Sequence, residues 1–93
     1  MLGDFASEAR TQTMGPVDGR MKVIDPLLSS SPSTPVQVLR WVDSEIWVRV
    51  PRRVLVGATV YLRTAAAIFV GEVRHCEPMD TEHEIRVLIK ESF

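Results

Sequence analysis

The chain has 93 residues, of which 45% are hydrophobic, a composition typical of one small globular domain and not of a disordered chain. Its 11 Lys and Arg nearly balance 12 Asp and Glu, so the formal net charge is -1 and no overall field favours nucleic acid or an anionic membrane as a partner. A single cysteine excludes an internal disulfide, and no apolar run approaches the ~20 residues of a membrane span. The first residues lack a signal-peptide pattern, so the sequence predicts a cytoplasmic protein.

Residues 1–35 carry the features of a flexible tail. Prolines stand in turn-like settings, "MGPVDG" and "IDPLL", and the run "SSSPSTP" contains only Ser, Pro and Thr, which favours extended, solvated backbone. We expect a short helix near Gly3–Arg10. The apolar side chains of this segment are expected to cover an edge or an apolar seam of the domain that follows, or of a second copy. They are Val23, Ile24, Leu27 and Leu28.

Residues 36–93 alternate apolar and polar side chains with a period of two, which is the period of a β-strand. Five runs share this period and are rich in Val, Ile and aromatic residues: 36–42 (VQVLRWV), 45–50 (EIWVRV), 59–63 (TVYLR), 67–76 (AIFVGEVRHC) and 83–90 (HEIRVLIK). Short turn signals separate the runs. The pattern predicts an all-β domain, a small antiparallel β-barrel behind a flexible N-terminal tail.

The last two runs hold both histidines and the only cysteine of the chain. Adjacent strand residues point to opposite faces, so His75 and Cys76 would diverge, and His83 could add only a second ligand to His75 across the turn. Tetrahedral zinc needs about four ligands. We therefore predict no metal site and a hairpin with its turn at 77–81. Gly71 interrupts a strand interior, which predicts a bulge or a sharp bend at a barrel corner.

The order of features from 36 to 89 resembles the PilZ domain, a small six-stranded β-barrel best known as a receptor for cyclic di-GMP, and this resemblance implies a barrel of the split-barrel type. The resemblance rests on "VGATVYLR" and "FVGEVRHCEP", where a Gly opens one strand and an apolar-Gly-x-Val motif lies in a long strand. PilZ receptors usually carry Arg-x-x-x-Arg before the first barrel strand and Asp/Asn-x-Ser-x-x-Gly on the following strands. Here "LLSSSPSTP" has no arginine, and Asp43 is followed directly by Ser44 with no Gly before Trp47. The resemblance implies a degenerate member that lacks the usual cyclic di-GMP motifs.

A cluster of Arg49, Arg52 and Arg53 is the densest positive charge in the chain. Guanidinium groups bind phosphate through two N–H donors and stack on bases. With Trp47, expected to face outward, and with Asp43, the cluster is a candidate site for a nucleotide or a protein partner. The alternative is a solvated turn whose charges keep a strand end from pairing with another edge.

Catalytic chemistry is not indicated, because no paired carboxylates, nucleophile–base pair or metal cluster emerges. We predict no catalytic residue, no cofactor and no enzyme activity. The remaining function is a non-catalytic, PilZ-like interaction module that acts by protein contact, through self-association or a signalling partner. The alternative is a cyclic di-GMP receptor with a rearranged arginine cluster. Nucleic acid is not expected as a partner, because such binding needs several phosphate contacts and the net charge is -1.

Overall fold

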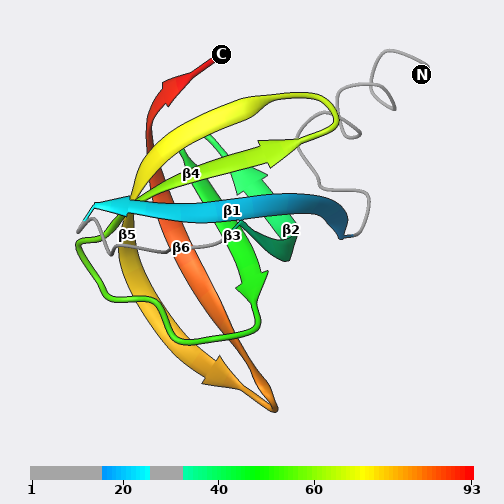
Figure 1. Ribbon diagram of the computed structural model, residues 1–93, viewed down its shortest axis with the longest axis vertical. Helices are drawn as coiled ribbons and strands as arrows, with labels where there is room; N and C mark the ends of the chain where they lie inside the picture. Colours follow the sequence, from blue (N-terminus) through cyan, green and yellow to red (C-terminus); the bar gives the residue numbers. More distant parts are fainter. Residues whose placement is uncertain (1–15, 26–32) are drawn as a thin grey trace, which may run out of the picture.

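The computed structural model describes residues 16–25 and 33–93, and the regular elements in these ranges are all β-strands. In chain order they are β1 (Val17–Asp25), β2 (Thr34–Val42), β3 (Glu45–Val50), β4 (Thr59–Thr64), β5 (Ile68–Met79) and β6 (Glu82–Ser92). Every pairing is antiparallel, and the strands close into a barrel in the order β1-β2-β3-β6-β5-β4, with β4 returning to β1 (Figure 1). The predicted small antiparallel barrel is confirmed.

The barrel interior is filled by every second side chain of each strand. On β3, Ile46, Val48 and Val50 are at most 1% exposed, and the residues between them face outward. Among the described residues no polar or charged side chain is buried. The buried core comprises Met21, Val36, Val38, Ile46, Val48, Val50, Val54, Ala58, Val60, Leu62, Phe69, Val73, Ile85 and Val87. Because apolar side chains occupy this interior, contacts with other molecules belong to the outer surface and the barrel ends.

Strand β1 corrects the prediction that residues 1–35 form a tail outside the barrel. It pairs with β2 on one side and with β4 on the other, so it closes the barrel. Met21 is 5% exposed and lies opposite both Thr34 and Leu62, which fixes β1 in the core. Val23 packs against this core as a residue of the barrel wall, and Ile24 is 36% exposed, so neither covers the barrel from outside as expected. The helix expected near residues 3–10 and the two leucines at 27 and 28 lie outside the described residues.

Gly71 confirms the predicted bulge in the long fifth strand. The pairing of β5 with β6 shifts register between Val70 and Gly71. A Cβ atom on Gly71 would lie 2.5 Å from the backbone oxygen of Leu88, closer than real Cβ atoms approach. A residue without a side chain is therefore needed where the two strands come together at this corner.

The β5–β6 hairpin projects beyond one end of the barrel. With 12 and 11 residues, these are the longest strands, and they pair down to Met79 and Glu82. The first residue of β4, Thr59, lies opposite Glu72 of β5. The part of β5 between Glu72 and the hairpin turn therefore extends beyond β4. The hairpin is seen at the bottom of Figure 1, beside the β3–β4 loop (51–58). This end of the molecule combines a projecting hairpin with a long connecting loop.

Candidate functional site

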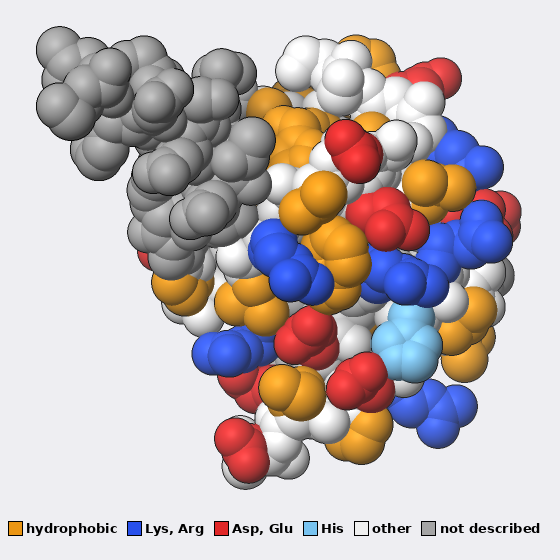
Figure 2. Space-filling view, turned by 180° about the vertical axis from the view of Figure 1, so that it is seen from behind, with side chains coloured by type: hydrophobic (Ala, Val, Ile, Leu, Met, Phe, Trp, Pro, Cys, Tyr) orange, Lys and Arg blue, Asp and Glu red, His pale blue; other side chains and the backbone are white. Residues whose placement is uncertain are grey.

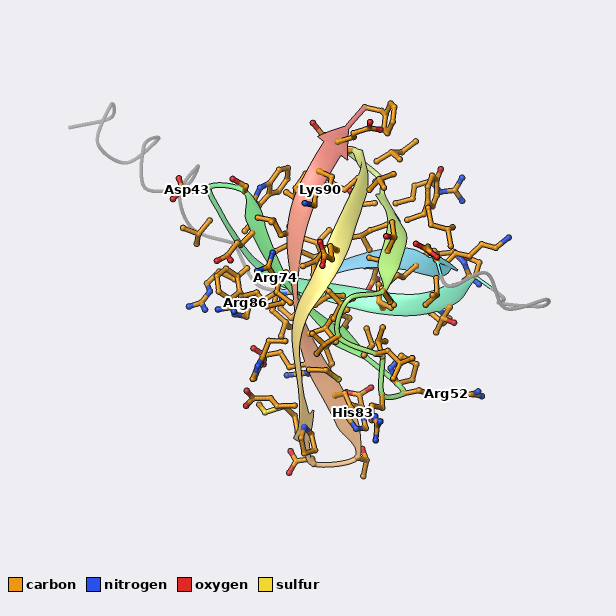
Figure 3. The ribbon with its side chains drawn as sticks, turned by 90° about the vertical axis from the view of Figure 1, so that its left-hand side faces the viewer. Asp43, Arg52, Arg74, His83, Arg86 and Lys90 are labelled. Carbon is orange, nitrogen blue, oxygen red and sulfur yellow. The ribbon has the colours of Figure 1, made fainter. Side chains whose placement is uncertain are left out.

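Asp43 lies far from the arginine cluster with which it was grouped. It begins the two-residue turn between β2 and β3 with φ 56°, whereas Arg52 and Arg53 follow the opposite end of β3. A six-residue strand is about 20 Å long, and Figure 3 shows Asp43 and Arg52 at opposite ends of the molecule. The left-handed φ gives Asp43 a structural role, because a short polar side chain tolerates this conformation better than most.

The three arginines have different surroundings. Arg49 lies on the outer face of β3, with its Nε 3.7 Å from Oε1 of Glu82 on β6. Arg52 is exposed and points away from the barrel in Figure 3. Arg53 is also exposed and borders a hollow under the barrel end. Their sequence proximity therefore does not by itself produce one convergent phosphate site.

Trp47 belongs to a row of side chains that crosses four strands on the outside of the barrel. Register pairs place Arg40 beside Trp47, Trp47 beside Arg86, and Arg86 beside His75. The guanidinium carbon of Arg40 lies 4.1 Å from the centroid of a Trp47 ring, which is the geometry of a cation–π contact. Trp47 therefore faces outward, as predicted, but is partly covered by an arginine.

Carboxylates match the charges of this outer row. Nε of Arg86 lies 3.8 Å from Oε2 of Glu45, and Nε2 of His75 lies 2.8 Å from Oε1 of Glu77. Figure 2 shows basic and acidic side chains interspersed over the face seen from behind. Such half-exposed pairs each contribute little stability, about 0–1 kcal/mol. They nevertheless leave the row without the excess positive charge that an anion site requires.

The two histidines do not face each other across the hairpin. His75 lies opposite Arg86, and His83 lies opposite Pro78. His75 is exposed on the outer face, whereas Cys76 is half-buried and packs against the core. In the part of the chain that the structure describes, no group of three or more His, Cys, Asp or Glu side chains is arranged to hold a metal ion.

A mainly apolar hollow lies between the β3–β4 loop and the projecting hairpin. We call it the loop groove; its volume is about 540 Å³, and it is lined by Arg53, Val54, Leu55 and Val56 from the loop and by Cys76, Pro78 and His83 from the hairpin. Leu55 is 55% exposed and Val56 is 62% exposed. Nδ1 of His83 is buried and has no hydrogen-bond partner among the described residues.

Buried residues and backbone hydrogen bonds on both sides of Leu55 and Val56 fix the backbone of the loop at these two exposed residues. Val54 is 9% exposed and Ala58 is 2% exposed, so the residues flanking Leu55 and Val56 are anchored in the core. The N–H of Ala58 donates to the carbonyl of Leu55, and the N–H of Gly57 donates to the carbonyl of Val73. Gly57 has φ 96°, a conformation that suits glycine. The loop therefore presents Leu55 and Val56 to solvent on a fixed backbone.

Comparison with family models, with curated proteins and with solved structures finds no match. The site is therefore argued from its own geometry. The described residues contain no helix that is both long and apolar enough to cross a membrane.

Sequence reasoning located Arg53 but missed the apolar part of the loop groove. Leu55 and Val56 stand in "PRRVLVG", where apolar residues inside a turn were a usable signal of a contact surface. Arg40 and Arg86 were missed for another reason. Their meeting with Trp47 depends on a register shift between Val38 and Arg40, and the alternation of a single strand carries no information about it.

Proposed function

We propose that the chain is a non-catalytic, PilZ-like interaction module that binds a protein partner through the loop groove. The observation that carries this proposal is the fixed exposure of Leu55 and Val56 beside an apolar hollow, at the end of a barrel whose interior is packed. Contiguous apolar surface held out of the core is a feature of protein contact sites. A partner would gain by covering it, because apolar area removed from water is stabilising.

The chemistry of the loop groove describes the partner surface that fits it. Its floor is apolar, Arg53 stands at its border, and Nδ1 of His83 lacks a partner within the described chain. A buried polar atom left without a hydrogen bond costs about 1–3 kcal/mol. The complementary surface therefore offers an apolar side chain, a hydrogen-bonding group for His83 and a carboxylate for Arg53.

The PilZ-like part of the proposal is supported by strand number alone, whereas the missing motifs bear on the ligand. A six-stranded barrel is what the sequence resemblance implies. With β1 beginning at Val17, an Arg-x-x-x-Arg stretch before the first strand would fall in residues 1–16, where Arg10 is the only arginine. The Asp43–Ser44 pair forms a turn of two residues. These features favour protein contact over nucleotide binding by the usual motifs.

Reversing the apolar character of the loop should abolish partner binding. Leu55→Glu/Val56→Glu places two carboxylates where an apolar surface is needed, so we expect chemical cross-linking in cells to lose the adducts that the unaltered chain forms. The matched control is Val17→Glu/Phe93→Glu, since both residues are exposed (43% and 72%) at the opposite end of the barrel. Circular dichroism should show both variants folded. Identical adducts from all three proteins would refute the proposed surface.

Cyclic di-GMP provides the test of the alternative function. Because Arg49 contacts Glu82 and Arg40 covers Trp47, a nucleotide at the cluster would have to displace existing contacts. We expect isothermal titration with cyclic di-GMP to give only heat of dilution. Saturable heat in the micromolar range that disappears in Arg49→Ala/Arg53→Ala would instead establish a receptor with a rearranged arginine site.

A further inference from the structure

The projecting hairpin has a strand edge with no described neighbour. On the side of β5 facing β4, the last backbone hydrogen bonds are at Val73, whose N–H donates to Ala58 (2.8 Å) and whose carbonyl accepts from Gly57 (2.7 Å). From Arg74 to Met79, the described structure pairs β5 with β6 alone. We call residues 74–79 the free edge. Such an edge is a template for pairing with another strand.

The polar backbone groups at the free edge can be assigned from the hairpin turn. Met79 and Glu82 close a turn of two residues, so their backbone groups face each other across the hairpin. Alternation along the strand then directs the backbone N–H and C=O of Cys76, and the C=O of Pro78, toward the free edge. Pro78 fits this assignment, because proline is tolerated in a strand where no N–H is required.

The polar side chains along the free edge complement one another when the strand is reversed. Arg74 and His75 stand at one end, and Glu77 stands toward the turn. An antiparallel second copy centred on Cys76 would place His75 opposite Glu77 of the other copy, and Glu77 opposite the other His75. The same register opposes Cys76 to itself and Arg74 to Pro78, and Arg74 stands at the register shift between Val73 and His75. In this register the contact that joins Nε2 of His75 to Oε1 of Glu77 within one chain (2.8 Å) can form between the two copies instead.

We propose that two copies of the chain associate about a two-fold axis by pairing their free edges, with the Cys76 residues opposite each other at the axis. This inference rests on the proposed function and names its partner as a second copy of the chain. The symmetric contact is self-complementary, as in most homodimers. It joins two barrels through one continuous β-layer.

The same arrangement covers the exposed apolar residues near the loop groove. In the register centred on Cys76, strand pairing ends where Pro78 faces Arg74, and Met79 of one copy then meets the β3–β4 loop that bonds Val73 of the other. Met79 is 39% exposed and Val56 is 62% exposed in the single chain. Edge pairing thus supplies hydrogen bonds at the centre of the contact. On either side of this centre, Met79 of one copy and Val56 of the other supply apolar surface that is buried.

Mass in solution tests the association directly. One chain weighs 10.5 kDa, so sedimentation of the full chain should give twice that mass, about 21 kDa, at high micromolar concentration. Two charge variants then test the register. Glu77→Lys alone removes the carboxylate that faces His75, and Arg74→Glu/His75→Glu alone opposes carboxylates to each other, so each should weaken association by roughly tenfold or more. A mixture of the two variants should recover the 21 kDa species, because the introduced lysine then faces an introduced glutamate and the remaining His75 again faces a Glu77.

The mixing experiment separates a register effect from a folding defect, since misfolded chains would not recover by mixing. Glu91→Lys, an exposed change of the same kind outside the free edge, is the control and should keep the dimer mass. Oxidation by copper–phenanthroline in air should join the two Cys76 thiols in a disulfide, because paired strand residues lie within its Cα–Cα range. The disulfide-linked dimer should be lost in Cys76→Ser.

The outcome distinguishes this inference from the proposed function. A single 10.5 kDa species at all concentrations, with no disulfide-linked dimer, overturns pairing of the free edges. If Leu55→Glu/Val56→Glu still loses cellular adducts in that case, the loop groove binds a different protein. A dimer whose mass is unaffected by both charge variants also overturns the proposal, because its contact then lies elsewhere.

Discussion

Removing residues 1–28 is expected to abolish the cooperative thermal unfolding of the chain. The deletion takes away β1, which pairs with both β2 and β4 and contributes the buried side chain of Met21. It would open the barrel, expose two strand edges and admit water to the core. A domain of this size is stable by only about 5–15 kcal/mol, so loss of a whole strand exceeds its reserve.

The measurement is far-ultraviolet circular dichroism during heating. The control is a deletion of residues 1–15, which retains all six strands and is expected to keep a sharp transition. If the chain lacking residues 1–28 melted at the temperature of the full chain, β1 could not be an essential barrel strand, and the closed topology would be wrong.

A single core truncation should have the second-largest effect. Leu62 on β4 is 1% exposed and lies opposite Met21 on one side and Phe69 on the other. Leu62→Ala removes apolar contacts and leaves a cavity, so we expect the free energy of unfolding to fall by about 2–5 kcal/mol. Urea titration followed by tryptophan fluorescence would measure this loss.

The matched control for the core truncation is Val42→Ala, since Val42 lies on β2 and is 43% exposed. A substitution at such a surface position should change the free energy of unfolding by about 0.5 kcal/mol or less. Equal effects of the two substitutions would mean that Leu62 does not lie in a close-packed interior.

Alternation of apolar residues was sufficient to predict most of the barrel. The runs at 45–50 and 59–63 became β3 and β4 with nearly the same bounds. Strand β1 was missed because residues 1–35 were judged by their prolines and charges. Within that segment, Val17, Met21 and Val23 occupy one face, and Asp18 and Lys22 lie on the other. The period of two was present, and Pro16 immediately before it did not prevent a strand from forming.

The candidate site was less predictable, because its parts meet through tertiary contacts. Arg53 was found from charge density, but the loop groove also needs Pro78 and His83, which are brought beside the loop only by the length of the hairpin. Asp43 was grouped with the arginines because it is near them in sequence. In the structure, β3 lies between Asp43 and Arg52, so these residues are near in sequence but stand at opposite ends of the strand.

The pairing of β1 with β4 has a consequence for the order in which the barrel forms during synthesis. Lys22 lies opposite Tyr61, a separation of 61 − 22 = 39 residues. At typical ribosomal rates, roughly 2–8 s pass between the emergence of these two partners. The nascent chain must therefore keep its first strand unoccupied on one side while later strands are made. During that interval the unpaired edge of β1 is exposed, and it is then that a chaperone would protect the nascent chain most.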